Sequence, residues 1–141
     1  MAEDAIRLEV VTPQKLALST VVSEVTGPSV EGEFGVLEGH RPLLAALKHG
    51  PVKYRERGVS KEAAVGPGFA EVRPHQVYLL VERWLPAAEI DVDEARDDLA
   101  RAEMTLRELA GQEQTAEHKA ARLEAAWAEV RLDVGRRARG I

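Results

Sequence analysis

The sequence of 141 residues contains no cysteine, which excludes disulfide bonds and thiolate metal sites. Aromatic residues make up only 4% of the chain, so packing must rely on valine, leucine and alanine. No apolar run approaches the roughly 18 residues that cross a membrane, and the acidic start lacks the apolar core of a signal peptide. The formal net charge of -5 argues against binding to nucleic acid, because nucleic-acid binders are normally basic. These absences predict a cytoplasmic protein that reaches a membrane only through a partner.

Catalytic motifs are also missing. The chain has neither a Walker A sequence nor a Gly-x-Ser-x-Gly nucleophile elbow. The Gly-Pro-Gly at residues 66–68 lacks the third glycine of a dinucleotide fingerprint and indicates a turn. His49, His75 and His118 are scattered beside lysine or proline, and we expect them at the surface. The sequence therefore predicts no enzymatic activity.

The composition changes at Pro86. All seven prolines and most of the glycines lie at or before this residue, whereas alanine, glutamate, arginine and leucine dominate after it. Such a shift, with a proline at the connection, is typical of a boundary between structural units. We predict one domain at residues 1–86 and a second at residues 87–141.

The first part has the pattern of short strands. Ile6, Leu8 and Val10 alternate with polar residues, as expected for a half-buried strand, and residues 77–81 repeat the alternation. Further strand-like stretches lie at residues 21–26, 52–56, 63–65 and 69–72, and each is bounded by turn signals. Among these signals, Gly27-Pro28 is expected to end the strand at 21–26. Strands at this spacing indicate a sandwich or a barrel, and we predict an antiparallel β-sandwich.

The second part has the pattern of two helices. Asp91 can cap the first helix, with Glu94 at the third helical position of a capping box. Gly111 interrupts the apolar pattern, and an antiparallel two-helix hairpin is predicted, which makes the overall class α+β. Because alanine buries much less apolar surface than leucine, we expect only modest stability and a possible opening of the hairpin. The two predicted apolar stripes are Ala95, Leu99, Ala102, Leu106 and Leu109, and then Ala116, Ala120, Leu123, Trp127, Val130 and Val134.

The stretch at residues 30–44 is the least ordinary part of the chain. Gly32, Gly35 and Gly39 fall within eight residues, which predicts a tight loop with backbone angles that other residues rarely adopt. Pro42 is expected to lead the chain into a buried apolar run at residues 43–47. Five charged or polar side chains are expected to point outward: Glu31, Glu33, Glu38, His40 and Arg41.

Two alternative functions remain open at this point. Glu31, Glu33, Glu38 and His40 could bind a metal ion through oxygen and nitrogen, as in a small metal-dependent hydrolase. The same residues fit better as a solvated loop that meets a partner, so we expect no metal. The second alternative is a free-standing binding module that uses the hairpin to form a homodimer.

Four segments together resemble the ε (epsilon) subunit family of rotary ATP synthases. They are residues 11–13, residues 31–44 (Glu-Gly-Glu-Phe-Gly-Val-Leu-x-Gly-His-x-Pro-Leu-Leu), residues 64–72 and residues 92–96. The resemblance implies a non-catalytic rotor subunit with a flattened β-sandwich and a helical tail. It further implies coupling of the γ shaft to the membrane c-ring during proton-driven ATP synthesis, and inhibition of ATP hydrolysis. Its place would be peripheral, on the cytoplasmic face of the bacterial inner membrane.

The resemblance also implies roles for individual residues. The glycine-rich stretch would face the polar loops of the c-ring and the γ subunit, through Glu31, Glu33, Phe34, Glu38, Gly39, His40 and Arg41. In an extended tail, basic residues would meet acidic segments of the catalytic β subunits, and of α. The basic residues are Arg122, Arg131, Arg136, Arg137 and Arg139. Cations near a helix end also favour the helix dipole, which is the simpler explanation of the cluster.

Some members of this family hold ATP with an Ile/Leu-Asp-x-x-Arg-Ala motif. Here Ile90-Asp91 has Glu94 at the arginine position, whereas Val92-Asp93 has Arg96 followed by Asp97, an acid that would repel phosphate. We therefore expect no tightly bound cofactor and at most weak regulatory binding of ATP, with contacts from Asp91 and Arg96.

Overall fold

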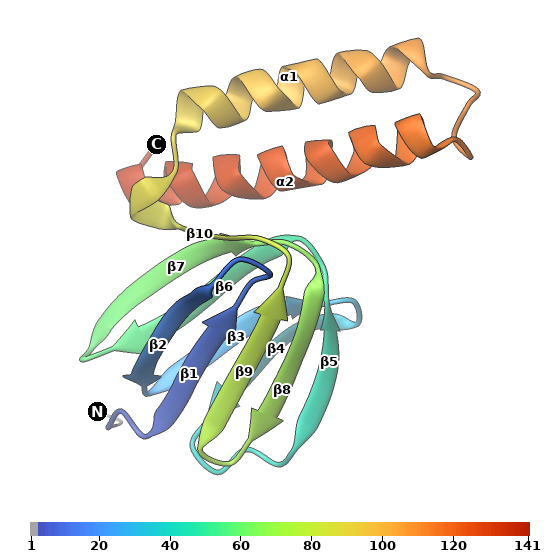
Figure 1. The fold of residues 1–141 in the computed structure, drawn as a ribbon. Helices are drawn as coiled ribbons and strands as arrows, with labels where there is room; N and C mark the ends of the chain where they lie inside the picture. Colours follow the sequence, from blue (N-terminus) through green and yellow to red (C-terminus); the bar gives the residue numbers. More distant parts are fainter. Residues whose placement is uncertain (1–2) are drawn as a thin grey trace. The chain divides into compact units, whose positions relative to one another are not determined.

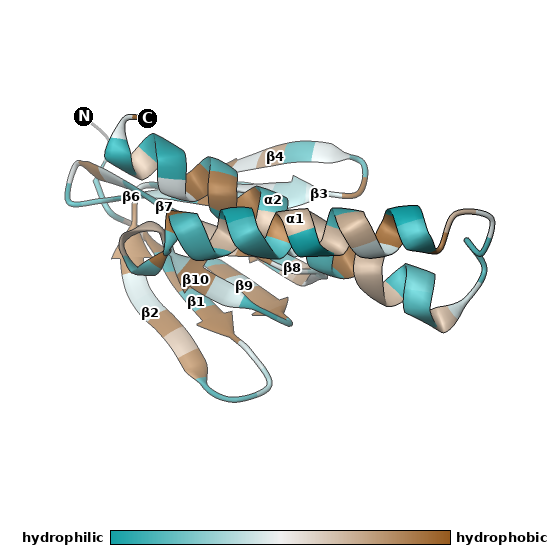
Figure 2. Cartoon of the chain, turned by 90° about the horizontal axis from the view of Figure 1, so that it is seen from above, coloured by the Kyte–Doolittle hydropathy of each residue, from teal (hydrophilic) through white to brown (hydrophobic). Residues whose placement is uncertain are grey.

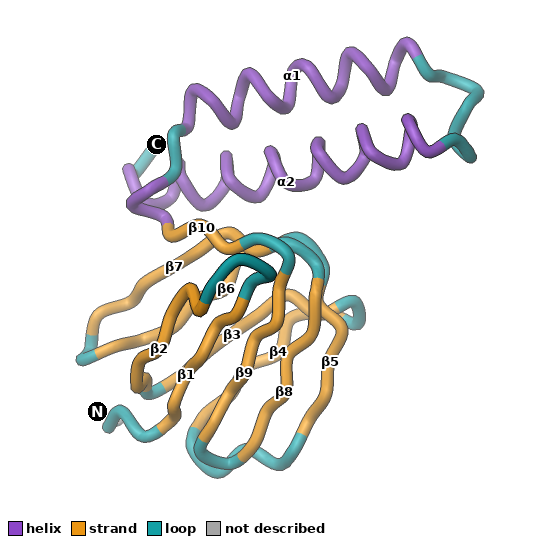
Figure 3. The backbone as a smooth tube through the Cα atoms, viewed as in Figure 1, coloured by secondary structure: helices purple, strands orange, loops and turns teal. Residues whose placement is uncertain are grey.

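The computed structural model describes residues 3–141 and divides into two compact units. The first unit ends at Pro86 and consists of strands, and the second begins at Ala87 and consists of helices (Figure 1, Figure 3). Each unit is described by itself. The α+β class and the order of a β-sandwich followed by a helical hairpin are as predicted.

The first unit contains ten strands. They are β1 (Ile6–Val11), β2 (Leu16–Val22), β3 (Glu24–Ser29), β4 (Gly32–Leu37), β5 (Leu43–Leu47), β6 (Gly50–Glu56), β7 (Val59–Val65), β8 (Gly68–Arg73), β9 (Gln76–Val81) and β10 (Trp84–Pro86). Their order is β10-β7-β6-β3-β5-β8-β9-β1-β2, and β4 pairs with β3 outside this path. All pairs are antiparallel except β1 with β9, which is parallel and departs from the predicted pattern.

The strands fold into two layers that meet at β3. Glu24 to Thr26 of β3 pair with β6, whereas Ser29 at its end pairs with Leu47 of β5. One layer thus holds β10, β7, β6, β3 and β4, and the other holds β5, β8, β9, β1 and β2 (Figure 1). The predicted end of the strand at Gly27-Pro28 is wrong, because β3 continues through both residues. Pro28 lies where β3 has left β6, so its missing N–H removes no bond between those strands.

The core between the two layers consists almost entirely of aliphatic side chains. The predicted alternation is confirmed, because Ile6, Leu8 and Val10 of β1 are fully buried. Residues 77, 79 and 81 of β9 are buried in the same way. Leu44, in contrast, is 72% exposed, so the prediction of a buried run at residues 43–47 is wrong. β5 has one face toward the core and the other toward solvent, as a strand in a two-layer sandwich must.

The second unit contains a short 3₁₀ turn, η1 (Ala87–Glu89), and the helices α1 (Val92–Glu108) and α2 (Ala116–Arg139). Asp91 caps α1 as predicted and accepts a hydrogen bond from the backbone N–H of Glu94 at 3.1 Å. Thr115 caps α2 by accepting from the N–H of His118. The helices form an antiparallel hairpin with alternating hydrophilic and hydrophobic bands (Figure 2). No helix within residues 3–141 is long and apolar enough to cross a membrane.

The apolar stripe predicted for α1 is confirmed, but the first half of the α2 stripe is wrong. Ala116 and Ala120 are exposed, and Leu123 is 45% exposed. The inward positions instead follow a seam of small residues with alternating three- and four-residue spacing: His118, Ala121, Ala125, Ala128, Leu132 and Gly135. Alanine occurs on both faces of this helix, so hydropathy alone could not distinguish them.

Candidate functional site

The glycine-rich stretch forms the strand β4 and two turns rather than one loop, so this prediction is wrong in detail. The first turn joins β3 to β4, and Gly32 has a φ of 124° that favours glycine. The hydroxyl of Ser29 donates to the carbonyl oxygen of Gly32 at 2.6 Å and accepts from the N–H of Glu31 at 3.1 Å. Glu31 and Glu33 are exposed at this end of the hairpin.

The second turn follows β4. Gly39 has a φ of 83°, and its N–H donates to the carbonyl oxygen of Pro74 at 2.8 Å. The Glu38 carboxylate lies 3.5 Å from Nδ1 of His75, which connects this turn to the turn between β8 and β9. Nδ1 of His40 lies 2.6 Å from the carbonyl oxygen of Arg41. The structure therefore fixes this turn through bonds to a neighbouring turn.

The predicted contact residues thus fall into two groups rather than one. Glu31 and Glu33 lie at one end of β4, and Glu38, His40 and Arg41 lie beyond the other end. Because a strand rises about 3.3 Å per residue, the six residues of β4 separate these groups by roughly 17 Å. Phe34 lies between them, half-buried against the core, and occupies the space that a side chain on Gly27 would fill.

The alternative of a metal-dependent hydrolase has no geometric support. Among residues 3–141, no group of three or more His, Asp or Glu side chains is arranged to hold a metal ion. The two groups of acidic residues lie at opposite ends of β4, which prevents Glu31, Glu33 and His40 from converging on one ion.

An exposed apolar face, not predicted from the sequence, lies on the layer of β5, β8, β9 and β1. The register places Ala46 beside Phe69, Phe69 beside Leu80, and Leu80 beside Val11. Phe69 is 56% exposed and Leu80 is 50% exposed. Leu44 lies two residues from Ala46 and faces the same side of the sheet. Val11 and Ala46 beside them are half-buried, so an apolar row crosses the four strands and is a candidate contact surface.

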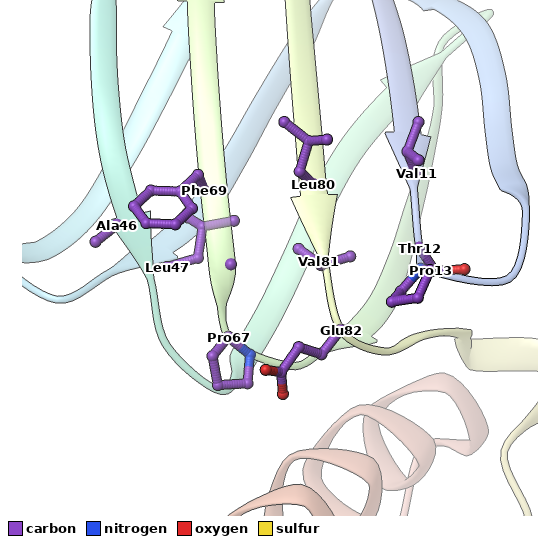
Figure 4. Close-up of a pocket in the computed structure, with 11 residues that line it drawn as sticks. Val11, Thr12, Pro13, Ala46, Leu47, Pro67, Phe69, Leu80, Val81 and Glu82 are labelled. Carbon is purple, nitrogen blue, oxygen red and sulfur yellow. The ribbon is translucent and has the colours of Figure 1, made fainter.

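Residues of this row line an open groove with a volume of about 610 Å³ (Figure 4). Phe69, Leu80 and Val11 line it from three neighbouring strands, and Pro13, Pro67 and Glu82 come from turns at its lower rim. The sequence signal for this surface was the unbroken apolar run at residues 79–81, because a strand with one solvated face has a polar residue at every second position.

The arginines predicted to form the inhibitory tail have partners within the hairpin. Arg131 is buried, and its Nη2 donates to the Asp98 carboxylate of α1 at 2.9 Å. Arg139 donates to the carbonyl oxygens of Gly135, at 3.0 Å, and of Ile90. Arg122 donates to the Glu113 carbonyl oxygen and to Nδ1 of His118. His118 is 8% exposed, so its predicted surface position is wrong. Arg136 and Arg137 lie in the last turn of α2.

The two residues predicted to contact ATP each have a partner in the second unit. The Asp91 side chain is engaged as the cap of α1. Arg96 is exposed and pairs with Asp93 on the same helix at 2.9 Å. The part of these two residues in ATP binding stays a prediction.

Shifted pKa values occur away from these surfaces. Hydrogen bonds from Lys61 and Thr20 lower the pKa of Glu56, and the same carboxylate raises the pKa of Lys61. Burial raises the pKa of Tyr54, whose ring stacks on Trp84 with centroids 6.4 Å apart. Backbone N–H groups, including that of Gly111, lower the pKa of Glu113 in the turn between the helices. These groups stabilise strand pairs and a turn, and do not converge on one point.

Comparison with known proteins decides the family. The family described as "ATP synthase, Delta/Epsilon chain, beta-sandwich domain" matches residues 5–87. The ATP synthase epsilon chain of Geobacter sp. (strain M21) is 42% identical over 132 residues, which cover 94% of this chain and 95% of that one. The chain belongs to the ATP synthase epsilon family. The epsilon chain of Geotalea uraniireducens (strain Rf4) is 40% identical over 138 residues, 98% of either chain. The resemblance in the sequence motifs is therefore confirmed.

The epsilon fold also extends to distant relatives. A chain in the structure of the Euglena gracilis mitochondrial ATP synthase, which contains OSCP, F1 and the c-ring, superposes with a TM-score of 0.78. The superposition covers all of this chain and 84% of that chain at 21% sequence identity. The likeness in fold thus covers both the β-sandwich and the helices.

Proposed function

We propose that the chain is a non-catalytic rotor subunit of a bacterial ATP synthase. In this proposal the β-sandwich couples the γ shaft to the membrane c-ring during proton-driven ATP synthesis, and the helical hairpin inhibits ATP hydrolysis. The observation that carries the proposal is the exposed apolar row of Leu44, Phe69 and Leu80, which gives a member of this family a surface for stable assembly. Burying one such side chain against a partner contributes roughly 1.5–3 kcal/mol.

The two kinds of surface on the sandwich suit two kinds of partner. The apolar row and its groove would bind the γ subunit, because a permanent contact in a rotating shaft needs extensive apolar burial. The turns at the ends of β4 carry Glu31, Glu33, Glu38 and Arg41, which suit the polar loops of the c-ring. Their backbones are held by internal hydrogen bonds, so they can meet a partner with little loss of conformational entropy.

The hairpin would act as a movable tail. Its seam includes Ala121, Ala125, Ala128 and Gly135, and each of these buries less apolar surface than a leucine would. Both helices have good helix formers and defined caps, and could stay helical on another surface. When extended, the arginines of α2 would meet acidic segments of the catalytic β subunits and of α. Contact with these subunits would stop rotation in the direction of hydrolysis.

The remaining parts of the proposal follow from the assembly. The subunit would lie peripherally on the cytoplasmic face of the bacterial inner membrane, held there by its partners. Any ATP contact through Asp91 and Arg96 would be weak, because Asp91 is engaged in capping and Asp97 adds negative charge nearby.

The proposal is tested by measuring ATP hydrolysis by the catalytic head assembled with γ. Three samples are compared: no addition, the full chain, and a chain ending after Glu89. The sandwich has its own core from residues 6 to 81, which supports its folding without the helices. We expect both chains to bind and only the full chain to inhibit. Failure of both chains to bind the γ-containing head would contradict the proposal.

A further inference from the structure

One ion pair connects the two helices of the hairpin at their middle. The Asp98 carboxylate of α1 accepts from Nη2 of Arg131 on α2 at 2.9 Å. The side chain of Arg131 is 9% exposed and that of Asp98 is 27% exposed. The other acidic partners of arginine on α1 lie within the same helix, as in the exposed pair of Arg96 with Asp93. The pair of Asp98 with Arg131 is therefore more buried than the pair of Arg96 with Asp93, and it joins two helices instead of two residues of one helix.

Arg131 makes two further contacts on its own helix. Its Nε donates to the carbonyl oxygen of Trp127 at 3.3 Å, and its guanidinium lies 5.6 Å from the centre of the Trp127 ring. Contact with an indole face stabilises an arginine cation, especially away from water. Both of these contacts can persist when α2 leaves α1. The carboxylate of Asp98 is the contact that separation of the helices must break.

Asp98 itself is connected to a second arginine. Its other carboxylate oxygen accepts from Arg101, which lies one turn further along α1 and is 73% exposed. This pair stays intact when the helices separate, because both residues belong to α1. Opening of the hairpin therefore leaves Asp98 with one partner and leaves Arg131 with none of opposite charge. Opening of the hairpin exposes Arg131 to water, where a carboxylate on a partner surface can take the place of Asp98.

We propose that Asp98 is a latch that holds Arg131 in the folded hairpin, and that an acidic partner surface competes with Asp98 for Arg131 when the tail extends. This inference rests on the proposed inhibitory function. It adds that Asp98 competes with the acidic target surface for Arg131. Loss of this ion pair from one side would leave Arg131 unpaired in the folded hairpin, so the pair influences how often the hairpin opens. Arg131 then serves the folded state through Asp98 and the extended state through the partner.

The latch is tested on the free full-length chain by hydrogen exchange of the helix amides, with the sandwich amides as an internal reference. Asp98→Asn removes the charge that Arg131 pairs with. Asp97→Asn is the matched control, because it makes the same change at the neighbouring exposed position of α1. Breaking a buried pair from one side is strongly destabilising, so we expect exchange in α1 and α2 to rise about tenfold or more with Asp98→Asn. Asp97→Asn should leave the exchange rate of the helix amides near that of the native chain.

A second variant keeps the test decisive if Asp98→Asn does not fold. Asp98→Leu combined with Arg131→Met replaces both charges by apolar side chains, a change that is often neutral or stabilising. We expect slow exchange in this double variant, at or below that of the native chain. Equal exchange in Asp98→Asn and Asp97→Asn would overturn the latch, and so would fast exchange in the double variant.

Inhibition of ATP hydrolysis by the same variants separates the latch from the proposed function. If both are correct, Asp98→Asn inhibits at a lower concentration than Asp97→Asn, because its tail opens more easily. Faster exchange without any change in inhibition would confirm the latch and contradict the inhibitory role of the tail. Unchanged exchange would contradict the latch whatever the inhibition shows.

Discussion

Gly135 of α2 lies against Ile90, so closely that a Cβ atom on Gly135 would come within 2.8 Å of the Ile90 Cγ2 atom. The same Cβ would lie 2.9 Å from Cγ2 of Val92. These distances are shorter than ordinary contact, and both neighbours are β-branched side chains with little rotational freedom. Glycine at this position therefore allows the end of α2 to pack on the start of α1.

Enlarging this position should open the hairpin. We predict that Gly135→Val destabilises the second unit by about 1–3 kcal/mol, the usual cost of overpacking a tight contact. Hydrogen exchange of the α1 and α2 amides measures the effect. Ala120→Val introduces the same side chain at an exposed position of α2 and should change exchange much less. Equal effects of the two changes would mean that the Gly135 contact does not limit opening.

The apolar row should carry the binding of γ. Phe69→Ser removes a large side chain that is 56% exposed in the free chain, and should weaken binding to γ about tenfold or more. Val59→Ser is a suitable control, because Val59 is also 56% exposed but lies at the start of β7, away from the row. Titration calorimetry with both variants gives the comparison. Similar losses for both would place the γ contact elsewhere.

The charges at the end of α2 should strengthen inhibition. Arg136→Gln combined with Arg137→Gln removes two of the three cations in the last turn of α2. We expect a several-fold weaker inhibition and a smaller dependence on salt, since salt screens exposed charges.

The control for this prediction removes two cations elsewhere. Arg107→Gln with Lys119→Gln changes the net charge equally, near the turn between the helices. Inhibition by this control should match that of the native chain, and assembly should be unchanged in both variants. An unaltered inhibition by the Arg136 and Arg137 variant would show that charge at this end does not hold the tail on its target.

Acid should weaken the sandwich through Glu56. Its folded-state pKa is lowered below the ordinary 4.5, so its contribution to stability is present above that pH and is lost as the pH falls through the folded-state pKa. The Lys61 pKa is raised above 10.5, so the contribution of Lys61 is lost only as the pH rises through that raised value. We predict that Glu56→Gln lowers the free energy of unfolding at neutral pH and reduces its decline in acid. Urea denaturation from neutral pH to about pH 3 measures both.

Local patterns in the sequence were enough to identify much of the fold. Alternation found β1 and β9, and the cap at Asp91 and the break at Gly111 defined the ends of α1. Local patterns failed where the role of a residue depends on which layer of the sandwich its strand belongs to. Gly27-Pro28 has the pattern of a strand end, but Pro28 lies where β3 passes from one layer to the other. That change of partner depends on the whole sandwich and leaves no local signal.

The candidate site could be predicted only in part for the same reason. The acidic and basic residues around β4 were found as a group, but the extended strand separates them into two. The exposed apolar row joins residues from β5, β8, β9 and β1, which are distant in the sequence and meet only through the register of the sheet. The pair of Asp98 with Arg131 likewise depends on how the two helices align.

The most direct test of the account is to lock the hairpin shut. A Cβ on Gly135 would lie 3.5 Å from the Cβ of Ile90, within the range of about 3.5–4.5 Å that a disulfide requires. The chain has no cysteine of its own, so Ile90→Cys with Gly135→Cys forms a single bridge. Val92→Ala is included in every form, because the Val92 Cγ2 atom would lie 2.9 Å from the new Cβ. Inhibition of ATP hydrolysis by the γ-containing head is then compared for the oxidised and reduced forms, with each single cysteine variant as a control.

We predict that the oxidised chain binds the head without inhibiting it and that reduction restores inhibition. Inhibition of equal strength by the oxidised and reduced forms would contradict the claim that the tail acts by opening.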